Sequence, residues 1–160
     1  MIGREAVDRG RVDEHRVVVE LVARGWGCVP FGQGAWNPDE TPGFGNAAVL
    51  AAIRATHGAL RHAPDILTAR GTDTRFVEVV NCGTWERRAL ELAKMEALSE
   101  WAHIAPVWVV DVSDWRTWRH VPGWAYEAVS DVSRDGRGSG DPWCLYRRRG
   151  RDAAFTEVFG

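Results

Sequence analysis

The chain has 160 residues, 45% of them hydrophobic, and a formal net charge of −2, so it can bury one core and predicts a single domain over residues 1–160. No stretch is long or apolar enough to span a membrane and no signal peptide is recognisable, so we expect a cytoplasmic protein. Three widely spaced cysteines support neither a disulfide framework nor a zinc site.

The first expected element is a helix over residues 10–24, in which Glu14 shares a face with Val17, Val18 and Leu21. The other charged residues of this segment project elsewhere, so Glu14 points toward the core. Its carboxylate belongs either to a polar cavity or to a buried ion pair without catalytic use.

Two acidic residues lie in or next to expected strands. The first three strands are expected over residues 26–31, 65–69 and 75–81. Asp65 follows a proline at the mouth of the second strand. Glu78 lies in the middle of the third, on the same face as Phe76 and Val80. Because a carboxylate in so apolar a strand is costly, Glu78 is a candidate ligand, with a salt bridge as the alternative.

The segment between the first two strands contains a Gly- and Pro-rich loop and a helix-like stretch. The loop covers residues 33–45 and the helix-like stretch covers residues 46–57. The position of the loop makes it a candidate flap over the site.

A second helix is expected over residues 84–102, with Thr84 as its N-cap, followed by a strand over residues 106–112. Lys94 lies at the centre of the apolar stripe of this helix, close to Ala97 and Leu98.

Lys94 is the only lysine among the 20 Lys and Arg residues of the chain. A buried ammonium needs a carboxylate partner or loses its proton, so its position indicates a site shared with the inward acids. The alternative is a lysine left by chance in an arginine-rich coding sequence, with its stem extending along the helix surface to water.

These segments resemble the PD-(D/E)xK nuclease superfamily, in particular its Holliday-junction resolvase and restriction-endonuclease-like branches. The resemblance rests on Gly10-x-x-x-Glu14, on Pro64-Asp65-Ile66-Leu67 and on Phe76-Val77-Glu78-Val79. It covers residues 10–112 and implies an α/β fold with an αβββαβ core, in which helices flank a central mixed four-stranded sheet.

The sequence departs from the superfamily at its signature lysine, because Val80 stands where the strand motif has Lys. Some members carry this lysine on the following helix, and Lys94 resembles such a migrated residue. The resemblance then implies Glu14, Asp65, Glu78 and Lys94 as catalytic residues. Asp65 and Glu78, with Glu14 directly or through water, would bind Mg²⁺ or Mn²⁺ for the hydrolysis of DNA phosphodiester bonds.

The substitution at Val80 also supports a function of another class. A nuclease-like domain that no longer cleaves can serve as a structural or DNA-binding component of a larger assembly. The four inward ionisable residues favour the active nuclease, whereas the tryptophan-rich composition and the lack of overall positive charge favour the inactive component.

Residues 113–160 form a Trp- and Arg-rich extension beyond the resemblance. Two strand-like runs, residues 124–129 and 143–149, predict an added C-terminal β-hairpin around a loop at residues 134–141. Its tryptophans either pack on the sheet or form a contact surface for a homodimer or a protein assembly.

Several arginines are candidates for contacts with DNA phosphates. Arg147, Arg148 and Arg149 form a basic run flanked by aromatic residues, with an ordinary solvated surface as the alternative. Arg61 and Arg75 lie near the acidic strands in the sequence and are weaker candidates.

Overall fold

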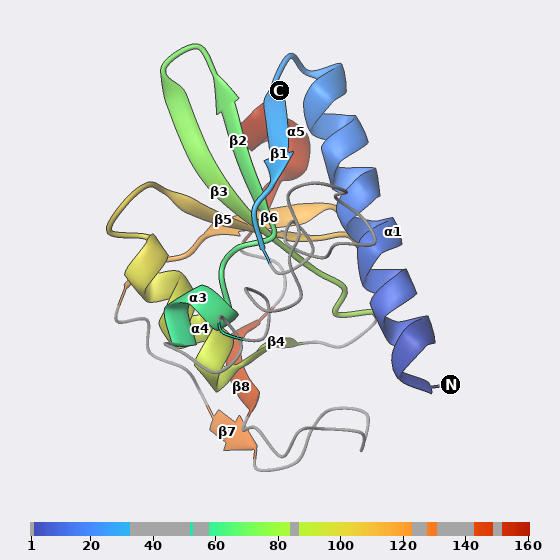
Figure 1. Ribbon diagram of the computed structural model, residues 1–160, viewed down its shortest axis with the longest axis vertical. Coiled ribbons are helices and arrows are strands. Elements are labelled where there is room, and N and C mark those ends of the chain that lie inside the picture. The colour runs from blue at the N-terminus through green and yellow to red at the C-terminus, as the bar shows by residue number, and fades with distance from the viewer. Residues whose placement is uncertain are drawn as a thin grey trace.

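The computed structural model describes residues 2–32, 52, 58–83, 87–122, 128–130, 143–148 and 152–160 (Figure 1). The helices of this part of the chain are α1 (Ile2–Ala23), α3 (Gly58–Arg61), α4 (Leu92–Trp101) and α5 (Phe155–Phe159). The strands are β1 (Gly27–Pro30), β2 (Ile66–Arg70), β3 (Asp73–Val80), β4 (Arg87–Glu91), β5 (Val107–Asp111), β6 (Arg116–Arg119), β7 (Ala128–Ser130), β8 (Trp143–Arg148) and β9 (Ala153–Ala154).

The strands form a mixed main sheet and a smaller antiparallel sheet. The main sheet has six strands in the order β1-β2-β3-β5-β6-β9, and only its β3–β5 pair is parallel. The smaller sheet has the order β4-β8-β7 and lies below the main sheet in Figure 1. The expected succession of helix, three strands, helix and strand is present as α1, β1, β2, β3, α4 and β5.

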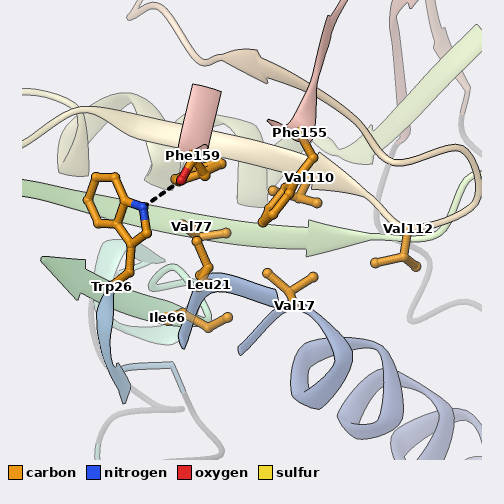
Figure 2. Close-up of a cluster of buried hydrophobic side chains, with 9 residues drawn as sticks. All are labelled: Val17, Leu21, Trp26, Ile66, Val77, Val110, Val112, Phe155 and Phe159. Carbon is orange, nitrogen blue, oxygen red and sulfur yellow. Dashed lines mark hydrogen bonds between the residues drawn. The ribbon is translucent and has the colours of Figure 1, made fainter. Parts of the chain in front are cut away.

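Each face of the main sheet carries its own hydrophobic cluster, because side chains alternate along a strand. On β3, Val77 belongs to a cluster with α1 and α5, whereas Phe76 belongs to a cluster with α4. Figure 2 shows the first cluster, which consists of Val17, Leu21, Trp26, Ile66, Val77, Val110, Val112, Phe155 and Phe159. The second consists of Phe76, Leu90, Met95, Leu98, Val107, Val109 and Trp118.

Helix α1 ends where the sequence predicts but begins earlier. Gly25 has φ +81°, and the N–H groups of Gly25 and Trp26 donate to the carbonyls of Val22 and Leu21, which is the Schellman arrangement of a helix end. The helix starts at Ile2 rather than at residue 10. Gly10 lies inside the helix, on an exposed part of it. Glycine lowers helix stability there without ending the helix.

The expected helix over residues 84–102 is wrong in its first half. Residues 87–91 are strand β4, and the helix begins only at Leu92, so Thr84 is not its N-cap and itself lies outside the described residues. The reason is tertiary: β4 pairs with β8, which lies more than 50 residues later in the chain, and this pairing overrides the local helical pattern. Lys94 therefore lies in the first turn of α4 rather than in its middle.

The main sheet is also larger than the expected four strands, because β6 and β9 extend it beyond β5. The chain after residue 112 thus contributes to the core, and Phe155 and Phe159 of α5 are buried in it. The predicted C-terminal hairpin is present as the antiparallel pair β7–β8. The loops at residues 33–45 and 134–141 lie outside the described residues, as does the helix-like stretch at 46–57 except for residue 52.

No helix among the described residues is long and apolar enough to cross a membrane.

Candidate active site around Lys94

Two acidic residues meet at the centre of the main sheet. Glu78 lies on β3 opposite Val109 of β5, and only 5% of its surface is exposed. Asp65 immediately precedes β2, and its Oδ2 accepts a hydrogen bond of 2.9 Å from the backbone N–H of Val79. This bond links the turn before β2 to the residue after Glu78, so the two carboxyl groups are held near each other.

Lys94 reaches this pair from α4. Its Nζ lies 2.8 Å from Oε2 of Glu78 and donates a hydrogen bond of 2.9 Å to the carbonyl oxygen of Ala63. The contact with Glu78 is an ion pair at hydrogen-bond distance, and both the Lys94 ammonium and the Asp65 carboxyl group act on the ionisation of Glu78. The inward direction expected for Lys94 holds, because Ala97 and Leu98 lie on its side of α4 and are buried.

The charges of the site are unbalanced. Burial raises the pKa of Glu78 well above its ordinary value, and the negative charge of Asp65 raises it further, which the Lys94 ammonium only partly offsets. Burial alone would lower the pKa of Lys94, but the charges of Glu78 and Asp65 outweigh it and raise that pKa. Lys94 therefore stays an ammonium at neutral pH, and the two carboxyl groups compete for one cation.

Glu14 is half-buried on α1 and acts on the site through its charge. Its carboxylate adds to the rise of the Lys94 pKa, after the larger effects of Glu78 and Asp65. The neighbouring Asp13 accepts a hydrogen bond of 3.1 Å from Asn81, which fixes the middle of α1 beside the end of β3.

Of the five candidate arginines, the structure describes the side chains of Arg61 and Arg75. Arg61 is exposed at the end of α3, close in sequence to the turn that carries Asp65. Arg75 lies on the face of β3 opposite Glu78, where its guanidinium pairs with Asp73 at 2.6 Å and donates to the Val158 carbonyl. Arg75 is thus committed to packing against α5. The side chains of Arg147 and Arg148 on β8, and all of Arg149, lie outside the described residues.

Sequence reasoning missed a buried acid at the end of β5. Oδ1 of Asp111 accepts hydrogen bonds from the N–H of Cys82 and from both the N–H and the hydroxyl of Ser113. Burial opposes its charge, but these hydrogen bonds outweigh burial and lower its pKa. The sequence pattern that could have revealed Asp111 is an Asp at the end of an apolar strand with a serine two residues later. This pattern is typical of an Asp side chain that accepts hydrogen bonds from the residues after it.

Comparisons with known proteins support the fold. No family model and no curated protein sequence matches the chain. Among solved structures, it is similar to Hjc of Archaeoglobus fulgidus, a Holliday junction resolvase from an archaeal hyperthermophile. The TM-score is 0.50 at 16% sequence identity, over 95% of this chain and 96% of that one. The fold is restriction-endonuclease-like.

The donor set fits a hard divalent cation held by two carboxylates. Asp65 and Glu78 could both supply oxygen ligands, and a divalent cation between them would favour the ionised form of Glu78, whose pKa is raised by burial and by the charge of Asp65. Within the described ranges, no three His, Cys, Asp or Glu side chains form a group that could hold a metal ion together, so Glu14 does not join this pair in one cluster.

A cavity of about 390 Å³ lies on the other side of the molecule. It is lined by residues of α1 and α5 and by the turn before β6, including Arg24, Trp115 and Phe155. None of the four predicted catalytic residues lines it.

Proposed function

We propose that the chain is a metal-dependent deoxyribonuclease that hydrolyses phosphodiester bonds at the site of Asp65, Glu78 and Lys94. The observation that carries this proposal is the 2.8 Å contact between Lys94 Nζ and Glu78 Oε2. An inward lysine beside two carboxyl groups is the composition that a PD-(D/E)xK site requires. The fold in which it occurs resembles that of a Holliday junction resolvase, which supports DNA as the substrate class.

Each residue has a chemical role in this proposal. Asp65 and Glu78 would hold Mg²⁺ or Mn²⁺, which when bound polarises the phosphoryl oxygen and lowers the pKa of a water. An ammonium has three donors, and Lys94 directs one at Ala63 O and contacts Glu78 with a second. The third would orient the attacking water and neutralise charge that develops on the phosphate. Glu14 would act on the site through its charge or through a bridging water.

The net charge of −2 requires that contacts with DNA be local. Arg61 is exposed beside the turn that carries Asp65, so it would contact a phosphate that flanks the cleaved bond. The basic run at Arg147, Arg148 and Arg149 would supply further phosphate contacts.

One observation favours the rival function, an inactive nuclease-fold component of an assembly. The exposed fractions of the Lys94 and Glu78 side chains are 15% and 7%, so little of either charged group is accessible to solvent or to a substrate. A closed ion pair is also what a purely structural role would retain.

Cleavage assays distinguish the two functions. Four-way junction, linear duplex and single-stranded DNA would each be incubated with wild-type protein in Mg²⁺, in Mn²⁺ and in excess EDTA. Asp65→Asn keeps an oxygen that can accept the Val79 N–H, and Lys94→Met keeps the length of the side chain. We expect metal-dependent cleavage by the wild type and a loss of at least about 100-fold in both variants.

The matched control is Glu96→Gln, which changes an exposed charge on the same helix and should leave cleavage unchanged. Equal activity in wild type, Asp65→Asn and Lys94→Met would identify a contaminating nuclease and contradict the proposal. Binding of DNA without cleavage, unaffected by either substitution, would support the assembly component.

A further inference from the structure

The chain that leaves β1 holds the turn on which Asp65 lies. The backbone N–H groups of Phe31 and Gly32 both donate to the carbonyl oxygen of Asp65, at 2.9 and 3.3 Å. From another direction, the Lys94 ammonium donates to the carbonyl of Ala63. The turn over residues 63–65 is therefore bonded both to the end of β1 and to α4.

Gly32 is buried and packs closely against this turn. A Cβ atom at Gly32 would lie 3.1 Å from Pro64 O, 3.4 Å from Asp65 Cα and 3.5 Å from Ala63 O. The first distance is tighter than an ordinary van der Waals contact. Glycine thus allows the close approach of two backbones, and a Cβ atom at this position would push on the Pro64 carbonyl, which adjoins the Ala63 carbonyl that accepts from Lys94.

Three aromatic rings connect the same elements. Phe31 lies 5.1 Å from Phe76 and 5.0 Å from Trp101, and Phe76 lies 5.3 Å from Trp101, measured between ring centroids. Phe76 precedes Glu78 by two residues on β3, and Trp101 follows Lys94 by two turns on α4. The aromatic triad of Phe31, Phe76 and Trp101 therefore links the strand exit, the Glu78 strand and the Lys94 helix.

We infer that Phe31 and Gly32 are positioning residues for the candidate active site. Gly32 sets how far the 63–65 turn stands from Lys94, and Phe31 ties that turn to β3 and α4 through the triad. The separation of the Asp65 carboxylate from the Lys94–Glu78 pair is then fixed by the end of β1, a segment that supplies no side chain to the chemistry. This inference rests on the proposed function for its catalytic meaning, but its geometry can be measured without cleavage.

The test compares Gly32→Ala with Gly27→Ala. A Cβ at Gly27, the first residue of β1, would make an ordinary 3.7 Å contact with Ala69 O, so this variant is the matched control. Because Lys94 is the only lysine, ¹⁵N-labelled lysine gives one side-chain ammonium signal in an NMR spectrum. We expect Gly32→Ala to shift that signal and speed its proton exchange, and to weaken Mn²⁺ binding in calorimetry at least about tenfold. Gly27→Ala should match the wild type in both readouts.

The Lys94 signal separates failure of the inference from failure of the proposed function. A folded Gly32→Ala variant with the wild-type signal would overturn the inference, whatever the cleavage assays give. A shifted signal in a protein whose wild type neither binds Mn²⁺ nor cuts DNA would support positioning and refute the nuclease. If Gly32→Ala does not fold, Phe31→Leu keeps the backbone bonds and weakens the triad. It should shift the signal in the same direction, and an unshifted signal in that folded variant would overturn the inference.

Discussion

At the scale of single residues, the position of the lysine can be tested directly. Val80 shares the face of Glu78 on β3, is half-buried, and lies beside Asp111 in the parallel register. A lysine there would have an acidic neighbour and would reach the volume next to Glu78. If Lys94 replaces the missing motif lysine, then moving it back should restore its chemistry.

We therefore expect Val80→Lys to rescue Lys94→Met. The double variant should cleave DNA at least about tenfold faster than Lys94→Met alone, because a positioned cation beside the phosphate is worth that much or more. The readout is the initial rate with saturating Mn²⁺. A double variant that folds and yet shows no gain over Lys94→Met would contradict the idea that the lysine migrated.

The ion pair of Lys94 and Glu78 should also contribute to the free energy of unfolding. Removing one partner leaves a buried, uncompensated group, so Lys94→Met should lower the free energy of unfolding by roughly 2–4 kcal/mol at neutral pH. The double variant Lys94→Met with Glu78→Gln should recover part of that loss, since no charge then remains to be buried. Urea unfolding of the single and double variants measures the coupling, and additive losses would show that the pair does not interact.

At the scale of elements, a partly buried hydrogen bond links α4 to the residue that follows β6. Ser99 of α4 lies 2.8 Å from Nε2 of His120, just after β6, and its hydroxyl donates to Met95 O. Nε2 is therefore the donor in this pair. Nδ1 is buried without a hydrogen-bond partner among the described residues, and burial lowers the pKa of His120 from 6.5 to about 4.

The sign of the pH dependence follows from this shift. Between pH 6.5 and about 4 the unfolded chain protonates this imidazole and the folded chain does not. The stability that neutral His120 contributes is thus complete above pH 6.5 and is lost as the pH falls toward 4. Between about pH 7 and about pH 5, the wild type should lose roughly 2 kcal/mol more than His120→Gln. Exposed His15→Gln is the control, and equal losses in wild type and His120→Gln would contradict the assignment.

The elements also show how far the sequence could predict the fold and the site. Period-two alternation on β3 and helical spacing after Lys94 predicted the directions of Glu78 and Lys94, because both depend on local geometry. The start of α4 could not be predicted, since residues 87–91 become a strand only through pairing with β8. Ala63 and Gly32 contribute to the site through backbone groups, which every residue has. Their role therefore could not be predicted from the residue types in the sequence.

At the scale of the whole molecule, the C-terminal helix α5 is part of the hydrophobic core rather than a separate extension. Phe159 is fully buried, and its ring packs edge-on against Trp26 at 5.6 Å between centroids. Its carbonyl accepts a hydrogen bond of 2.9 Å from Trp26 Nε1 (Figure 2). Arg75, between Trp26 and the carbonyl of Val158, holds the same helix against β3. α5 is therefore part of the layer that supports the sheet beneath Glu78.

If α5 belongs to the core, Phe159→Ala should lower the free energy of unfolding by roughly 3–5 kcal/mol, because the truncation leaves a cavity at a site with no exposure. Such a loss is a large fraction of the stability of a typical domain, so one cooperative transition should shift as a whole. Urea unfolding followed by tryptophan fluorescence and by circular dichroism measures it, with exposed Thr156→Ala on the same helix as the control. If α5 were a separate extension, Phe159→Ala would unfold α5 alone and leave the main unfolding transition unchanged. A decrease in the free energy of unfolding below about 1 kcal/mol would therefore contradict the assignment of α5 to the core.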